Sequence, residues 1–124
     1  MVYQSVNRKG ERMRIYISHP YGGKEENMKK VENIIHSLIK ENPNNTYISP
    51  IHCFSFAYND YPYEQGLDMC LNLLGACDKM LVFGDWKNSR GCTAEVLYCE
   101  MHMIPYVIEQ GEGREEERLS TFAI

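Results

Sequence analysis

Short apolar runs and longer amphipathic stretches alternate along the chain. The apolar runs are four to six residues long and rich in aromatic or β-branched side chains, which is typical of buried strands. We therefore expect four strands, at RIYIS (14–18), TYIS (46–49), KMLVF (79–83) and IPYVIE (104–109).

The segments between these runs predict helices. After the GGK turn (22–24), apolar residues recur at helical spacing, at Met28, Val31, Ile34, Ile35, Leu38 and Ile39. A second helix is expected from about Pro62 to Cys77, with the proline in its first turn, and a third over CTAEVLYCEMHM (92–103). The aromatic stretch IHCFSFAYNDYP (51–62) is expected to be a long loop, and loops of that length are often functional.

Strands that alternate with helices predict an α/β fold. We expect a small doubly wound domain of the flavodoxin-like or Rossmann-like kind, whose mainly parallel sheet of four to five strands is covered by helices. The domain should span residues 13–109, after a polar arm at 1–12. The tail, 110–124, is either a loose end or a short helix that contacts a partner subunit through Leu119, Phe122 and Ile124.

Composition and charge exclude some classes of protein function. At 124 residues, with 44% hydrophobic and 24% charged residues, the chain has room for one folded domain and one site. It has no apolar run near the roughly 20 residues of a spanning helix and no signal-peptide core, so we expect a cytoplasmic protein. A net charge of −4 without a basic stripe argues against binding to duplex nucleic acid.

The cysteines are odd in number and form no C-x-x-C pair, which argues against both a disulfide framework and a zinc cage. They are Cys53, Cys70, Cys77, Cys92 and Cys99. We expect small core residues and no metal, although Cys92, Cys99 and His102 leave a metal site as an alternative with an unusual ligand spacing.

Ligands of doubly wound sheets bind beyond the carboxyl ends of the strands. In this chain those ends are SHPYGGK (18–24), SPIHCFSF (49–56) and GDWKNSRGCTAE (84–95). All three segments are rich in polar or aromatic side chains, and we expect the site there.

Glu95 is the strongest catalytic candidate. It is expected in the first turn of the third helix, where the helix dipole alone would favour a carboxylate by about 0.3 to 1 kcal/mol. However, Cys92 stands where a capping box would need Ser or Thr, and Glu95 borders an apolar stripe. We expect an ionised, partly shielded carboxylate that looks into a cleft and could attack an anomeric carbon.

The other candidates each have a structural explanation as well. Asp68 is either a solvated helix residue or, if its helix points at the cleft, a carboxylate partner for Glu95. Tyr16 is either a core residue or a hydrogen-bond donor to the substrate. Gly22, Gly23 and Lys24 make either a tight turn or an anion-binding turn. The aromatic group either stacks a base or covers the sheet: Tyr21, His52, Phe54, Phe56, Tyr58 and Trp86.

The succession R-I-Y-I-S-H-P-Y-G-G-K, S-P-I-H, L-D-M-C-L-N-L-L-G-A-C-D-K-M-L-V-F-G-D-W and S-R-G-C-T-A-E resembles the nucleoside 2-deoxyribosyltransferase-like superfamily. The resemblance covers about residues 13–108 and is greatest to a small uncharacterised branch from bacteria and phages. It implies that Glu95 is the catalytic nucleophile and that Tyr16 and Asp68 assist it. Asp68 lies two residues farther from Asp78 than in the nucleotide hydrolases of the superfamily, and Cys70 falls at the strict position.

The resemblance implies cleavage of the N-glycosidic bond of a 2'-deoxynucleoside or its 5'-monophosphate through a covalent glutamyl-glycosyl intermediate. The enzyme would be a hydrolase if water accepts the sugar from the intermediate, and a transferase if a second base accepts it. No cofactor is implied, and a homodimer or higher homo-oligomer is expected. The alternatives are a non-catalytic protein that captures a nucleotide or a nucleotide-derived signal, and a scaffold domain. The expected substrate-binding and phosphate-binding residues are Ser18, His19, Tyr21, Gly22, Gly23, Lys24, His52, Gly84, Trp86, Ser89 and Gly91.

Overall fold

The computed structural model describes residues 11–110 and 114–116, which form a five-stranded sheet with the order β2-β1-β3-β4-β5. The first four strands are parallel, and β5 pairs antiparallel with β4 at the edge. The strands are β1 (Arg14–Ser18), β2 (Thr46–Ile48), β3 (Lys79–Val82), β4 (Tyr106–Gln110) and β5 (Arg114–Glu116). The prediction of a small, mainly parallel α/β fold is confirmed.

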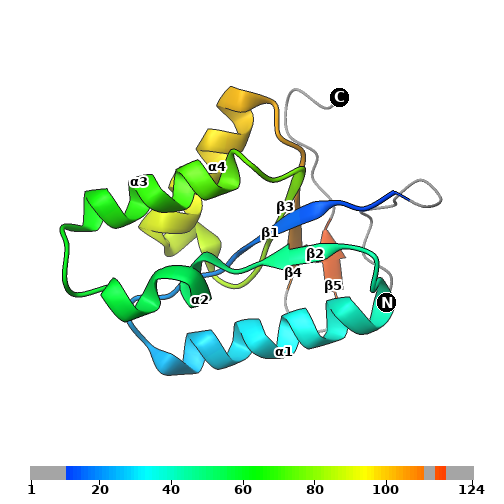
Figure 1. Ribbon diagram of the computed structural model, residues 1–124, viewed down its shortest axis with the longest axis horizontal. Coiled ribbons are helices and arrows are strands. Elements are labelled where there is room, and N and C mark those ends of the chain that lie inside the picture. The colour runs from blue at the N-terminus through cyan, green and yellow to red at the C-terminus, as the bar shows by residue number, and fades with distance from the viewer. Residues whose placement is uncertain (1–10, 111–113, 117–124) are drawn as a thin grey trace.

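Helices cover both faces of the sheet. Figure 1 shows α1 and α2 on one face and α3 and α4 on the other. The α-helices are α1 (Glu25–Glu41), α2 (Pro50–Phe54), α3 (Tyr63–Leu74) and α4 (Arg90–His102), and the short 3-10 helices are η1 (Ser55–Ala57) and η2 (Trp86–Asn88). None of the helices in the described part of the chain is long and apolar enough to cross a membrane.

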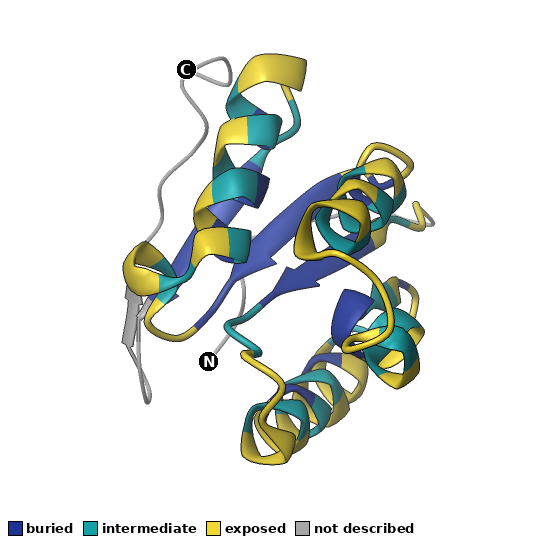
Figure 2. Cartoon of the chain, turned by 90° about the vertical axis from the view of Figure 1, so that its left-hand side faces the viewer, coloured by how far each residue is buried: buried dark blue, intermediate teal, exposed yellow. Residues whose placement is uncertain are grey.

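The central strand β1 sends alternate side chains into two separate cores. Ile15 and Ile17 pack under α1 and α2, whereas Tyr16 packs with residues of β3, α3 and α4. The strands β1, β3 and β4 are almost entirely buried between the two layers of helices (Figure 2), which explains their nearly continuous apolar sequences. The same alternation turns Tyr16 and Ser18 toward α4, where the candidate nucleophile lies.

The structure differs from the sequence prediction at two helices. The expected loop at 51–62 contains α2 and η1, because the Ser49 hydroxyl caps α2 by accepting the His52 N–H at 3.2 Å and Pro50 fits the first position. Helix α4 begins before residue 92, because Ser89 caps it and accepts the N–H of Cys92 at 3.2 Å. Glu95 therefore lies in the second turn, and its expected place in the first turn was wrong.

The two ends of the chain are only partly described. Part of the expected tail forms β5, whereas Leu119, Phe122 and Ile124 lie outside the described residues, as does most of the expected arm at 1–12. The proposal that the tail contacts a partner subunit therefore stays a prediction.

Gly84 makes the turn after β3 possible. Its φ is 75°, and a Cβ atom there would lie 3.0 Å from Pro20 Cδ. We expect Gly84→Ala to lower the free energy of unfolding by about 1 to 3 kcal/mol, measured by urea denaturation. Gly66 in α3 is the matched control, because a Cβ there meets nothing within 4 Å and Gly66→Ala should stabilise by about 0.5 to 1 kcal/mol. Equal stability of Gly84→Ala and wild type would contradict this explanation of the turn.

Candidate active site

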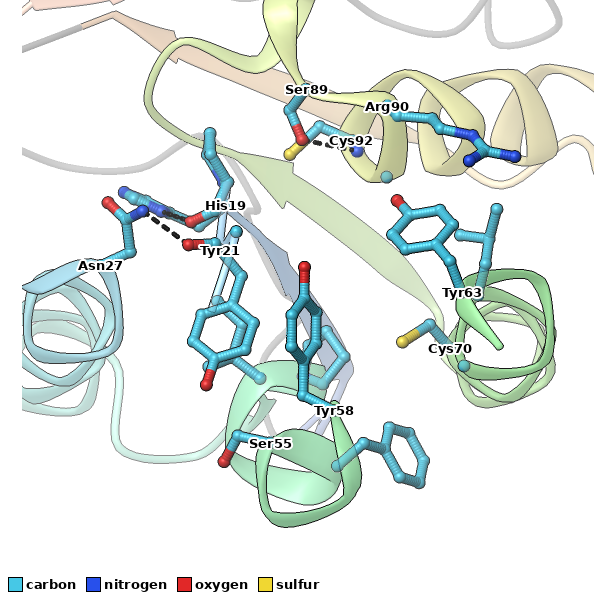
Figure 3. Close-up of a pocket in the computed structure, with 18 of the residues that line it drawn as sticks. His19, Tyr21, Asn27, Ser55, Tyr58, Tyr63, Cys70, Ser89, Arg90 and Cys92 are labelled. Atoms are coloured by element: carbon cyan, nitrogen blue, oxygen red, sulfur yellow. Dashed lines mark hydrogen bonds between the residues drawn. The ribbon is translucent and has the colours of Figure 1, made fainter. Parts of the chain in front are cut away.

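A cavity of about 490 Å³ lies at the carboxyl ends of the parallel strands. Its walls come from the β1–α1 loop, from α2 and η1, from the first turns of α3 and from the start of α4. Figure 3 shows side chains from these separate segments converging on the same space. The ends of the parallel strands thus form a cavity at the edge of the sheet where the sequence predicts a site.

Glu95 lies at the floor of this cavity, with both carboxyl oxygens bound. Its exposed fraction is 6%. The Tyr16 hydroxyl donates to Oε2 at 2.5 Å, and the Ser18 hydroxyl donates to Oε1 at 2.6 Å. Because Tyr16 and Ser18 are two residues apart on β1, their side chains share the sheet face that α4 covers.

Burial controls the charge of Glu95. It raises the pKa of the carboxyl from 4.5 to about 7, and the hydrogen bonds from Ser18 and Tyr16 offset only part of this rise. The group is therefore partly protonated at neutral pH, which differs from the expected ionised and only partly shielded carboxylate. The reason is that the carboxyl is almost completely buried.

Asp68 does not reach the cavity in this structure. Its side chain is exposed, whereas Cys70 of the same helix lines the cavity and points its sulfur inward (Figure 3). Residues two apart are separated by about 200° around a helix axis, so only one of these two side chains can face Glu95. The expected pairing of Asp68 with Glu95 is thus not found, and the thiol occupies the facing position.

Two thiols lie near Glu95. Cys70 and Cys92 both line the cavity, and the charge of Glu95 adds to burial in raising the pKa of each thiol. Burial raises the pKa of each thiol to about 11, so both are neutral at pH 7. Among the described residues, the groups that influence the pKa of the carboxyl are therefore polar, and none of them is a cation.

The β1–α1 loop supplies one wall of the cavity. The wall includes Tyr21, Gly22 and Lys24. Gly23 lies against the ring of Tyr58, and a Cβ atom at residue 23 would lie 3.2 Å from Cε2 of that ring. Both glycines have positive φ, of 60° and 75°, so the turn needs them whether or not it binds an anion.

His19 also belongs to this wall. Its Nδ1–H donates to the Pro20 carbonyl at 2.7 Å, and burial lowers the pKa of the imidazole. The ring is therefore neutral at pH 7, with Nε2 as its acceptor.

The start of α4 forms the opposite wall. Ser89 and Gly91 line it, and a Cβ at residue 91 would lie 3.1 Å from the Tyr63 hydroxyl. Arg90 lies 4.5 Å above the ring of Tyr63 and donates to Glu64 at 3.2 Å, so it links the first turns of α3 and α4 (Figure 3).

Several lining residues were missed by the sequence predictions, because helix boundaries decide which side chains face inward. They include Asn27, Tyr61, Tyr63, Asp85, Asn88 and Arg90. The short spacing of tyrosines before α3 was the one visible signal for part of this set.

Five predicted binding residues are not among those that line the cavity, namely Ser18, Gly23, His52, Gly84 and Trp86. Ser18 binds Glu95 from β1, and Gly23 lies against Tyr58. His52 binds the Ser49 hydroxyl at 2.7 Å and Glu32 at 2.9 Å, a serine-histidine-glutamate chain whose serine is buried and caps α2. Gly84 forms the turn against Pro20, and Trp86 packs on the core between the sheet and α4. Their roles in this structure are local.

The described residues contain no group of three His, Cys, Asp or Glu side chains placed to hold a metal. All five cysteines are free; Cys53 is exposed, which differs from the expectation of core residues, whereas Cys77, Cys92 and Cys99 are buried. His102 stacks on Tyr98, with ring centroids 4.0 Å apart.

Residues 13–109 match the family described as a domain of unknown function, DUF7768. The chain belongs to this family. A comparison with functionally curated proteins finds no match. Among solved structures, the fold is similar to that of a 2-deoxyribosyltransferase from the psychrotolerant bacterium Bacillus psychrosaccharolyticus, with a TM-score of 0.62 and 18% identity over 84% of this chain and 77% of that one. At this identity the likeness establishes a shared fold.

The raised pKa of Glu95 predicts how stability changes with pH. The folded protein binds the Glu95 proton more tightly than the unfolded chain, so this contribution to stability is complete below about pH 4.5 and is lost as the pH rises through about 7. Glu95→Gln should therefore raise the free energy of unfolding above pH 7, by up to about 3 kcal/mol, and should have little effect near pH 4.5. Urea denaturation over this pH range measures the difference. A difference that does not vary with pH would show that Glu95 is not the titrating group.

Proposed function

We propose that the protein cleaves the N-glycosidic bond of a 2'-deoxynucleoside or its 5'-monophosphate, with Glu95 as the nucleophile. The observation that carries this proposal is a buried carboxyl at the floor of an open cavity, bound on both oxygens by hydroxyl groups. The shared fold with a 2-deoxyribosyltransferase supports the choice of substrate class.

The proposed reaction has two steps. A Glu95 oxygen attacks C1' of the sugar while the electron pair of the C1'–N bond leaves with the base, which gives a glycosyl ester. Water or a second base then attacks C1' and releases the carboxylate. Tyr16 and Ser18 orient the attacking group, and no step is assigned to Asp68 because its side chain faces solvent.

The cavity walls suit the two ends of a nucleotide. Aromatic faces for stacking a base come from Tyr21, Phe54, Tyr58, Tyr61 and Tyr63. The N–H groups of Lys24 and Ser89 bind Tyr21 and Trp86 within the chain, so a sugar or phosphate would use those of Gly22 and Gly23 in the turn and of Arg90 and Gly91 at the helix start. Phe56 is 84% exposed and Tyr61 is 54% exposed, and a second subunit in the expected homo-oligomer would cover this apolar rim.

A nucleotide-binding protein without turnover is the second candidate. It is favoured by the pKa of about 7, which leaves part of Glu95 uncharged at neutral pH, and by the thiol of Cys70 where a carboxylate partner was expected. Both features weaken nucleophilic attack without impairing binding.

One experiment distinguishes the two candidate functions. The protein is incubated with a panel of deoxynucleosides and their monophosphates, and the free bases are measured by chromatography. Base release should fall at least about a thousand-fold in Glu95→Gln. The matched control is Glu100→Gln, because Glu100 also lies on α4 and accepts a tyrosine hydroxyl, that of Tyr106 at 2.6 Å, but lies outside the cavity lining. Nucleotide binding by wild type without base release would establish the non-catalytic candidate.

If Glu95 must be ionised to attack, kcat/KM should rise with pH through about 7. The hydrogen bond from Tyr16 lowers the pKa of Glu95, so Tyr16→Phe should shift this rise to higher pH by about one unit. Tyr106→Phe, which removes the hydroxyl that binds Glu100, should leave the midpoint unchanged. A rate that does not depend on pH between 5 and 9 would remove the ionised carboxylate from the mechanism.

A further inference from the structure

The outward side of α4 is apolar, unlike that of the other long helices. Leu97 is 59% exposed, Met101, one turn later, is 68% exposed, and Met103, which ends the helix, is also 68% exposed. We call these three residues the α4 patch. The exposed positions of α1 and α3 are instead mainly polar or charged, among them Lys29, Lys30, Asn33, His36, Gln65, Asp68 and Asn72.

The inward side of α4 is apolar as well. Cys99 and Val96 pack against the sheet, and Cys92 is 1% exposed. The two carboxyl groups of the helix do not make an outward polar face, because Glu95 is buried and Glu100 accepts the Tyr106 hydroxyl. A helix that is apolar on opposite sides is typically covered on both, so the α4 patch predicts a covering segment.

The direction of β5 leads the chain toward this patch. Helix α4 ends at His102 and β4 begins at Tyr106, so the end of α4 lies beside the start of β4. Strand β5 runs antiparallel to β4, and its last residue, Glu116, pairs with Ile108. The chain therefore leaves β5 in the direction of the start of β4, which is the side of the sheet where Met103 lies.

The α4 patch also lies on the flank of α4 that is nearer to β5. The hydrogen bond of 2.6 Å from Tyr106 to Glu100 places the Glu100 flank of the helix over β4, and Leu97 is three residues before Glu100 on the same flank. Tyr98 lies on the other flank, where a Cβ at Gly75 after α3 would lie 2.7 Å from its hydroxyl. The patch is thus open toward the strands β4 and β5.

We propose that residues 119–124 of the same chain dock on the α4 patch, through Leu119, Phe122 and Ile124. This segment, LSTFAI, has no charged residue and follows the charged run REEER (114–118). Six residues span up to about 20 Å when extended, whereas the patch extends over about 9 Å of helix. The segment is therefore long enough to cover the patch. This inference goes beyond the proposed function and does not depend on it.

The tether through β5 favours the chain's own segment over that of a second copy. Only Glu117 and Arg118 separate the end of β5 from Leu119. A short tether gives the segment an effective concentration on the order of millimolar near the patch, and closing so short a connection costs little entropy. A segment from a second copy has neither advantage.

The test is NMR of the full chain with carbon-13-labelled methionine methyl groups. The methyl of Met101, assigned by Met101→Leu, should show a nuclear Overhauser contact to the ring protons of Phe122, assigned by Phe122→Leu. Truncation after Arg118 should abolish this contact and shift the Met101 methyl signal. The matched control is Ile39→Ser, because Ile39 is 48% exposed but lies on α1, across the sheet, so both signals should stay unchanged.

Two results would overturn the proposal. The first is the absence of the contact together with a Met101 signal that truncation leaves in place. The second is a contact that appears only between labelled and unlabelled chains in a mixed sample, which would assign the patch to the segment of a second copy. If the truncated chain does not fold, Phe122→Ser in the full chain replaces it and should shift the same Met101 signal.

Discussion

The structure depends on the burial of one carboxyl group between α4 and the central strand β1. Removing Glu95 from water disfavours its charged form, and two hydroxyls from a single strand offset part of that cost. Such an arrangement is possible because β1 is covered on both faces, so that its alternate side chains serve different cores. Tyr16 is therefore both a core residue and a hydrogen-bond donor to Glu95.

Strand order explains why the cavity lies where it does. The sheet order places β1 between β2 and β3, and all three run parallel. The segments that follow these strands meet at one edge, although the residues they contribute range from His19 to Glu95 along the chain. The carboxyl sits at the junction of these segments with the start of α4, and aromatic side chains from the segment between β2 and α3 line the same cavity.

The electrostatic setting of the site is unusual for a buried acid. The neighbours of the carboxyl are hydroxyls and neutral thiols, whereas the cations Lys24 and Arg90 line the cavity from exposed positions. Desolvation is therefore the largest influence on the pKa of Glu95, with no cation among its causes. This places its protonation near neutral pH, where small changes in hydrogen bonding alter the charged fraction.

The sequence by itself determined the alternation of strands and helices, the parallel sheet and the edge at which the cavity lies, because these follow from local periodicity and strand direction. It also singled out Glu95 as a residue at the border of an apolar stripe. Only the tertiary structure decided the charge of that residue, because the packing of α4 against β1 removes its carboxyl from water. Tertiary structure also decided which residue of α3 faces the cavity. The rotation of α3 about its axis turns Cys70 toward the cavity and Asp68 toward solvent, and periodicity alone cannot set that rotation.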